Sequence, residues 1–258
     1  MMEGPGTMHA TSPQLTHAQL EQYHRDGYLV VPNLLSGEEV DTFVNYEATQ
    51  DKKFRESLHN HVDNPQWAYV AKHPNMVSLI RQILQSTNPM IVQTMYLEKW
   101  PAEAGKGTAL HQDTHYLPNE PNTLMACWIA MSDTDGENGG LCVVPGSQVQ
   151  GLYKTHKSTN LKDHQSWETE VVMRDRTGKE WRETIYSFEI EGLDRDKIVN
   201  LEVPKGSGVF FTGMTIHGSY ANRSVGRVRR AFATHFVKEG TWVLRSDVQT
   251  LAPVERGG

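Results

Sequence analysis

The chain has 258 residues, a formal net charge of −6 and a sequence pI of about 6.0. That length is enough for one domain with a sizeable hydrophobic core, and the acidic balance offers no basic surface for a nucleic-acid partner. The sequence contains no apolar run of the roughly 18 residues needed to span a membrane, so we expect no membrane partner. The only cysteines, Cys127 and Cys142, lie in apolar stretches, which favours buried thiols and a cytoplasmic location. Nothing in the composition indicates an oligomeric state.

The N-terminal third is expected to be a flexible tail followed by helices. Residues 1–14 are polar and rich in Pro and Gly, without the apolar centre of a secretion signal. Two capping boxes, in which a hydroxyl and a side chain three residues later bond each other's backbone, predict helix starts at Thr16 and Ser36. Gly27 is expected to end the first helix, before a short strand at 28–31. A third helix is expected from Pro74 onward.

From residue 90 the pattern changes to β-branched and aromatic runs separated by Gly, Pro, Asn and Asp. The expected strands are residues 90–100, 124–131, 141–144, 184–190, 198–203, 208–216 and 229–237. Strands at short intervals without helices between them indicate a sandwich or barrel, so the fold class is α+β with a mainly β core. We expect one domain over residues 15–258, with the polar stretch 153–182 as a lid or insert.

The pattern His-x-Asp, which lets one imidazole and one carboxylate share a metal ion, occurs three times, at His24, His61 and His111. His24 lies in the last turn of an expected helix, where a cation is favourable without any metal. His61 lies in a polar stretch that we expect to be a solvated turn. His111 and Asp113 lie instead on an extended segment, where alternation points both side chains to one side. Context therefore selects His111 and Asp113 as metal ligands.

A third ligand is expected from a distant part of the chain. His217 follows the apolar run 208–216, which is the best candidate for a neighbouring strand. Two histidines and one carboxylate form the facial triad of non-haem Fe(II) oxygenases, which leaves three coordination positions for a bidentate 2-oxo acid and O2. A zinc hydrolase would rather use three protein ligands and one water, and the sequence leaves that alternative open.

A 2-oxoglutarate site also needs a fixed cation for the distal carboxylate, and a guanidinium matches a carboxylate in a two-point fork. Arg229 opens the last expected strand. Alternation places it on one face with the small residues Ala231 and Ala233, which leave room beside a cosubstrate. Arg227 and Arg230 are close alternatives, and Arg229 is preferred.

Several motifs in order give the chain a resemblance to the phytanoyl-CoA dioxygenase family. They are Val92-Gln-Thr-Met-Tyr-Leu-Glu-Lys99, Leu110-His-Gln-Asp-Thr-His-Tyr116, Cys127-Trp-Ile-Ala130, Glu137-Asn-Gly-Gly-Leu-Cys-Val-Val-Pro-Gly-Ser147 and His217-Gly-Ser-Tyr-Ala-Asn-Arg-Ser224. The resemblance implies a double-stranded β-helix, also called a cupin-like jelly roll, with flanking N-terminal helices. It also implies Fe(II), with 2-oxoglutarate and O2 as cosubstrates.

By this resemblance, iron would be bound by His111, Asp113 and His217, and the cosubstrate carboxylate by Arg229 with help from Ser219. The positions that line the cosubstrate pocket in relatives correspond here to Met95, Trp128 and Gln93.

Two positions depart from the family pattern. Val228 stands where the family usually has its arginine, so the assignment of Arg229 requires one inserted residue in the preceding turn and keeps Arg227 as an alternative. Gln148 replaces the histidine that usually follows Pro-Gly-Ser. Asp113 is intact, which argues against a halogenase, where a small residue vacates that coordination position.

The implied reaction couples conversion of 2-oxoglutarate to succinate and CO2 to oxidation of an unactivated C–H bond, with hydroxylation as the default outcome. We expect a small metabolite such as an amino acid or a phosphonate as substrate. An anionic group on it is one option, because the stretch that includes Lys157, Lys162 and His164 is locally basic. The candidate substrate contacts are His115, Tyr116, Tyr153 and Lys157.

Other functions stay open from the sequence. An acyl-CoA or natural-product hydroxylase is the alternative within the family. A non-catalytic jelly-roll binding protein and a zinc hydrolase are the alternatives of another class.

Overall fold

The computed structural model describes residues 12–101, 106–159 and 164–255. The expected tail falls mostly on residues 1–11, and Lys162 on 160–163, so both lie outside the described residues. Within the described residues, Pro13 is already in contact with a helix, since its carbonyl accepts hydrogen bonds from Ser78 Oγ and Gln82 Nε2.

The helices gather in the first third of the chain, as expected. They are α1 (His17–Asp26), α2 (Gly37–Glu47), α3 (Lys52–Arg55), α4 (Asn60–Asp63), α5 (Pro65–Ala71) and α6 (Pro74–Leu84). Both predicted capping boxes are present, and Gly27 ends α1 with φ of 79°. No helix within the described ranges is both long and apolar enough to cross a membrane.

The prediction of a solvated turn around His61 is wrong. His61 lies in α4 and is 1% exposed, with its Nδ1 3.1 Å from Thr94 Oγ1. The prediction failed because α4 packs against β2 (Met90–Lys99), a contact that the polar sequence around His61 does not indicate.

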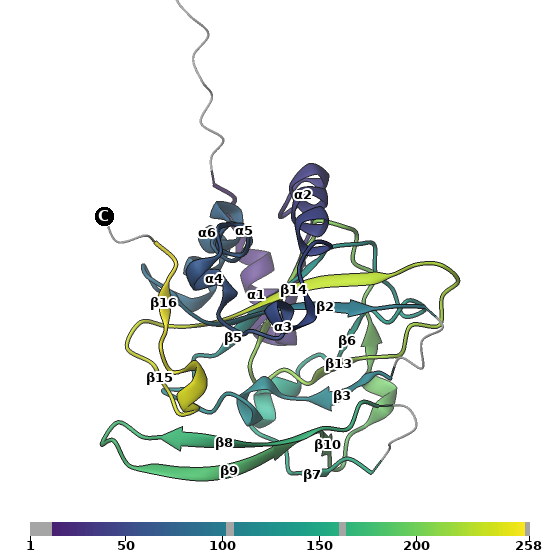
Figure 1. The fold of residues 1–258 in the computed structure, drawn as a ribbon. Coiled ribbons are helices and arrows are strands. Elements are labelled where there is room, and N and C mark those ends of the chain that lie inside the picture. The colour runs from purple at the N-terminus through teal and green to yellow at the C-terminus, as the bar shows by residue number, and fades with distance from the viewer. Residues whose placement is uncertain (1–11, 102–105, 160–163, 256–258) are drawn as a thin grey trace, which may run out of the picture.

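Two antiparallel sheets form the β core (Figure 1). The six-stranded sheet has the order β1 (Tyr28–Val31), β12 (Gly208–Thr212), β5 (Met125–Ala130), β14 (Arg229–Val237), β2, β16 (Ala252–Pro253). The four-stranded sheet has the order β11 (Val199–Asn200), β6 (Leu141–Val143), β13 (His217–Ser219), β3 (Thr108–His111). The predicted α+β class with a mainly β core is therefore confirmed.

Side chains of the six-stranded sheet alternate between the helices and the second sheet. On β14, Phe232 packs edge-on against Phe43 and Trp67 of the helices, with ring centroids 5.2 and 5.1 Å apart. Ala231 and Ala233 belong instead to the cluster between the sheets. The alternation predicted for this strand is confirmed, and Arg229 starts on the inner face.

The strand expected over 208–216 is shorter in the structure. β12 ends at Thr212, a turn follows, and His217 opens β13 in the other sheet. In that turn, Thr212 Oγ1 lies 2.9 Å from Thr215 Oγ1 and accepts from the amide of Met214. Gly213 has no room for a side chain, since an added Cβ would lie 2.8 Å from Leu124 and from Thr114. The chain thereby crosses from one sheet to the other just before the third candidate ligand.

The polar stretch 153–182 contains strands rather than a loop. It includes β7 (Thr155–Lys157), which pairs with β10 (Phe188–Ile190), and β8 (Glu168–Arg174), which pairs with β9 (Glu180–Tyr186). The strand expected over 184–190 is split between β9 and β10, outside the two main sheets. Figure 1 shows the β8–β9 hairpin on the side of the molecule away from the helices, and β10 is the strand that contacts β3.

Short elements complete the described chain. They are the pair β4 (Asn119–Glu120) and β15 (Trp242–Val243), and the 3-10 turns η1 (Asp113–His115), η2 (Ser147–Gln150), η3 (Arg195–Lys197) and η4 (Ser246–Val248).

Candidate metal and 2-oxoglutarate site

The three predicted metal ligands come together on the four-stranded sheet. β13 pairs with β3 so that His217 lies directly opposite His111, and Asp113 begins the 3-10 turn that follows β3. Asp113 Oδ1 lies 3.3 Å from His111 Nε2 and 3.5 Å from His217 Nε2. One ligand atom from each residue falls within 4.8 Å of the others. A single ion between the three side chains would contact all of them.

Both histidines are oriented by backbone carbonyls. His111 Nδ1 lies 2.8 Å from the carbonyl of Ala109, and His217 Nδ1 lies 3.0 Å from that of Thr215. A carbonyl can only accept, so each Nδ1 carries the proton and each Nε2 keeps its lone pair toward the common centre. The tautomer that a metal needs is therefore already selected.

The charge states of the group also suit a divalent metal. Burial lowers the pKa of His217 to about 4, against the opposing effect of Asp113. Burial pushes the pKa of Asp113 upward, but the electrostatic effect of His217 and His235 and the hydrogen bonds from His111 and His235 outweigh it and hold that pKa well below its usual range. An ionised carboxylate and two imidazoles whose Nε2 atoms face a common centre form a 2-His-1-carboxylate set that fits Fe(II) with open coordination positions.

A cavity of about 540 Å³ extends from this group between the two sheets. Arg229 lines it and is 4% exposed. Its Nε donates to the carbonyl of Gly139 and its Nη1 to that of Leu97, both at 3.1 Å. Burial lowers the pKa of Arg229 to about 10, so the guanidinium is still charged at neutral pH.

Lys99 is a second buried cation in the same cavity, and no local pattern in the sequence indicates that role. It lies opposite Arg229 on β2, and its Nζ donates to Ser219 Oγ at 2.7 Å and to the carbonyl of Tyr220 at 2.5 Å. Burial, followed by the charge of Arg229, lowers its pKa to about 7. Within the described part of the chain, neither Lys99 nor Arg229 forms an ion pair. The two cations therefore provide a receptor for an anion.

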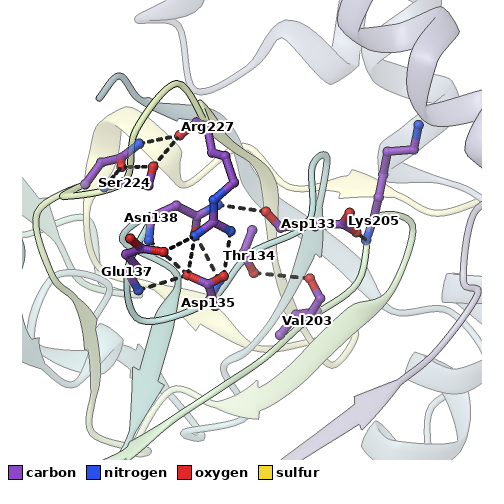
Figure 2. Close-up of polar contacts among 10 residues, drawn as sticks. Asp133, Thr134, Asp135, Glu137, Asn138, Val203, Lys205, Ser224 and Arg227 are labelled. Atoms are coloured by element: carbon purple, nitrogen blue, oxygen red, sulfur yellow. Dashed lines mark hydrogen bonds and ion pairs between the residues drawn. The ribbon is translucent and has the colours of Figure 1, made fainter. Parts of the chain in front are cut away.

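Arg227 and Arg230 have other roles. Arg227 is on the surface and pairs with Asp135 and Glu137 at 2.6 Å each, within the network shown in Figure 2. Arg230 pairs with Glu98 at 3.1 Å and stacks on Trp100.

The network around Arg227 stabilises the loop that supports Arg229 (Figure 2). Asp135 accepts hydrogen bonds from the amides of Glu137 and Asn138, and the side chain of Asn138 donates to the carbonyl of Asp133. Gly139 follows with φ of 82°, and an added Cβ there would lie 2.7 Å from the carbonyl oxygen of Tyr220. The loop thus needs glycine to bring its carbonyl to Arg229.

Most other predicted site residues line the cavity, and three do not. Those that line it are Gln93, Met95, Trp128, Ser219 and Tyr116.

The other three residues, predicted as substrate contacts, do not line the cavity. His115 Nε2 lies 3.1 Å from the carbonyl of Tyr153, and the amide of Tyr153 donates to Gln112 Oε1, so these contacts hold the backbone together. Lys157 is exposed and pairs with Glu168. The charge of Lys157 is therefore balanced by an acidic neighbour, and this side chain does not line the cavity.

Gln148, the departure from the family pattern, also has a structural role. Its Nε2 donates to the carbonyls of His24 and Arg25 at 3.0 and 3.1 Å and so caps the end of α1.

Two further residues line the cavity that no motif in the sequence indicates. Trp167 is 41% exposed, and its ring centroid lies 5.4 Å from that of Tyr116. Arg245 is 8% exposed, pairs with Asp247 at 2.7 Å and lines the same cavity. Trp167, Tyr116 and Arg245 therefore add an aromatic pair and a guanidinium to the lining of the cavity.

Comparison with known proteins agrees with this geometry. The chain is 29% identical over 251 residues to the peroxisomal phytanoyl-CoA dioxygenase of Bos taurus, covering 86% of this chain and 68% of the bovine protein. It is 27% identical over 252 residues to the Homo sapiens protein of that name, with the same two coverages.

Solved structures share the fold. The epimerase SnoN, in complex with Fe3+, alpha ketoglutarate and nogalamycin RO, has a TM-score of 0.68 at 19% identity, over 89% of this chain and 86% of that one. EvdO2 from Micromonospora carbonacea var. aurantiaca, complexed with 2-oxoglutarate, has a TM-score of 0.62 at 16% identity, over 96% of both chains. The predicted jelly-roll fold is confirmed.

Residues 23–231 match the family described as Phytanoyl-CoA dioxygenase (PhyH). That match covers most of the chain and includes both histidines and the aspartate of the candidate metal centre. The protein therefore belongs to the phytanoyl-CoA dioxygenase family and is an iron- and 2-oxoglutarate-dependent dioxygenase.

Proposed function

We propose that the enzyme hydroxylates an aliphatic C–H bond of a small metabolite and releases succinate and CO2. His111, Asp113 and His217 hold Fe(II), and Arg229 binds the distal carboxylate of 2-oxoglutarate together with Lys99 and Ser219. The observation that carries this proposal is one cavity that holds both the three-residue metal group and two buried cations without ion-pair partners among the described residues.

The protein side of the reaction is binding and orientation. The bound iron supplies the chemistry that activates O2 and breaks the C–H bond. Arg229 and Lys99 fix one end of 2-oxoglutarate, which directs its 2-oxo acid end toward the metal ligands. Trp128 and Met95 also line the cavity, and their apolar side chains would shield the bound cosubstrate from bulk water. No side chain is needed as a general base, because a C–H bond carries no acidic proton.

The cavity also limits the substrate. A volume of about 540 Å³ is in the middle of the usual range of roughly 300–1,000 Å³ for small-molecule sites, and 2-oxoglutarate must share it. We infer that the reacting part of the substrate lies against Tyr116 and Trp167. Lys157 does not line the cavity, and Arg245, which does, already donates to both carboxylate oxygens of Asp247. An anionic substrate group would therefore have to compete with Asp247 for Arg245.

An acyl-CoA substrate is the second candidate, favoured by the names of the bovine and human relatives. Its nucleotide would lie outside the cavity, with only the acyl end near the metal. A natural-product hydroxylase is a third possibility with the same site.

A screen of succinate release tests the choice of substrate. Small amino acids, phosphonates, polycyclic natural products and acyl-CoAs are each incubated with enzyme, Fe(II), 2-oxoglutarate and O2, and the products are identified by mass spectrometry. We expect a gain of 16 mass units on a small metabolite, with succinate formed in equal amount. Turnover of acyl-CoAs alone would contradict the small-metabolite proposal and leave the cofactor assignment intact.

We also propose a cytoplasmic location, supported by two cysteines that are buried and unpaired. The bovine relative is named as peroxisomal, so a peroxisomal location is the alternative. Cell fractionation decides between them, and recovery of the enzyme with peroxisomes would contradict our proposal.

A further inference from the structure

The two carboxylate oxygens of Asp113 face different partners. Oδ1 lies 3.3 and 3.5 Å from the Nε2 atoms of His111 and His217, on the metal side. Oδ2 lies 3.0 Å from Nε2 of a third histidine, His235. One oxygen is therefore directed to the metal and the other to a residue outside the ligand set.

His235 is placed for this contact by the sheet. It lies on β14 opposite Gln93 of β2, at a register shift between His235 and Phe236, and it is 3% exposed. The side chain lies on the inner face, where it lines the same cavity as Asp113.

The hydrogen bonds define the tautomer of His235. An ionised carboxylate can only accept, so Nε2 carries the proton that is donated to Asp113. Its Nδ1 then has a lone pair, and Gln93 Nε2 lies 3.4 Å from it with protons to donate. In the series of hydrogen bonds from Gln93 through His235 to Asp113, each contact therefore joins one donor to one acceptor.

We propose that His235 is a positioning residue that makes Asp113 bind the metal through Oδ1 alone, and that Gln93 holds His235 in the required tautomer. A carboxylate with both oxygens free can take two coordination positions. Because a donor occupies Oδ2, Asp113 takes one position, and three remain for 2-oxoglutarate and O2. This inference rests on the proposed ligand set of His111, Asp113 and His217.

Two substitutions separate the hydrogen bond from the packing. His235→Phe keeps a ring of similar size but removes the donor, whereas His235→Gln returns an N–H near the position of Nε2. His61→Phe is the matched control, because His61 is also a buried histidine with a side-chain hydrogen bond, to Thr94, but does not line the cavity. His217→Ala tests the ligand set itself.

The first measurement is the affinity of each metal-free variant for Co(II), without 2-oxoglutarate, together with its melting temperature. Loss of such a supporting contact typically weakens metal binding by about 10- to 100-fold. We expect that loss in His235→Phe, recovery to within about fivefold of wild type in His235→Gln, and wild-type affinity in His61→Phe. The second measurement is the visible band of the anaerobic Fe(II)–2-oxoglutarate complex, which should shift in His235→Phe and return in His235→Gln.

Wild-type Co(II) affinity and an unshifted band in His235→Phe would overturn the inference. Equal losses in His235→Phe and His235→Gln would also overturn it, because packing rather than the hydrogen bond would then be responsible. Wild-type metal affinity in His217→Ala would instead show that the proposed ligand set is wrong.

Discussion

Replacement of Arg229 is expected to weaken 2-oxoglutarate binding far more than replacement of Arg227, two residues away. The Arg229 guanidinium is 4% exposed and held by two carbonyls, so a carboxylate that binds it is removed from water. Breaking one partner of such a buried charge pair costs about 2–5 kcal/mol. Lys99 stays nearby and retains part of the attraction, so we expect the lower end of about 2–3 kcal/mol in Arg229→Ala. That loss corresponds to a roughly 30- to 150-fold weaker Kd.

Arg227→Ala is the matched control. The side chain of Arg227 is 43% exposed, and surface ion pairs like those to Asp135 and Glu137 contribute about 0–1 kcal/mol. We expect less than about a fivefold change in Kd, through small adjustments of the supporting loop. Calorimetric titration of 2-oxoglutarate into anaerobic Fe(II) enzyme measures both variants. Equal effects, or a larger effect of Arg227→Ala, would refute the assignment of Arg229.

Three further predictions concern the cavity and its surroundings. The pKa of Lys99 is lowered to about 7, and a bound carboxylate favours the charged amine. The affinity for 2-oxoglutarate should therefore fall above pH 7, by at most about tenfold per pH unit, and less steeply in Lys99→Met. A flat wild-type profile in pH-dependent calorimetry would contradict this. Trp167→Ala should raise the KM of the primary substrate by about 2- to 10-fold, which is the effect of losing one aromatic contact. The Kd of 2-oxoglutarate should stay within about twofold. Equal changes in the KM, measured by steady-state kinetics, and in the Kd, measured by calorimetry, would count against a substrate role. Lys157→Ala should leave kcat/KM within about twofold, because Lys157 is exposed and pairs with Glu168; a tenfold loss would return that residue to the substrate site.

Local signals in the sequence were enough to predict much of the fold. The capping boxes at Thr16 and Ser36 depend on side chains three residues apart, so they are visible without any tertiary information. The two-residue alternation along β14 likewise placed Arg229, Ala231 and Ala233 on the inner face. These features are short-range and hold in the structure.

Features that depend on distant contacts were missed. His61 has polar neighbours in sequence, and only the packing of α4 on β2 buries it. Lys99 and His235 each act across a strand pair, next to Arg229 and Gln93, and no local pattern reveals that register. The basic character of Lys157 was visible, but its acidic partner Glu168 comes from another strand. The roles of residues that act across a strand pair could therefore be identified only from the structure.

The most direct test of the iron and 2-oxoglutarate site is anaerobic reconstitution followed by visible spectroscopy. Metal-free enzyme is mixed with Fe(II) and then with 2-oxoglutarate, beside the variants His217→Ala and Arg229→Ala. We predict a weak visible charge-transfer band in the wild-type enzyme, no band in His217→Ala, and a band in Arg229→Ala only at much higher 2-oxoglutarate concentration. Absence of the band in the wild-type enzyme, with zinc retained in place of iron, would contradict the proposed site.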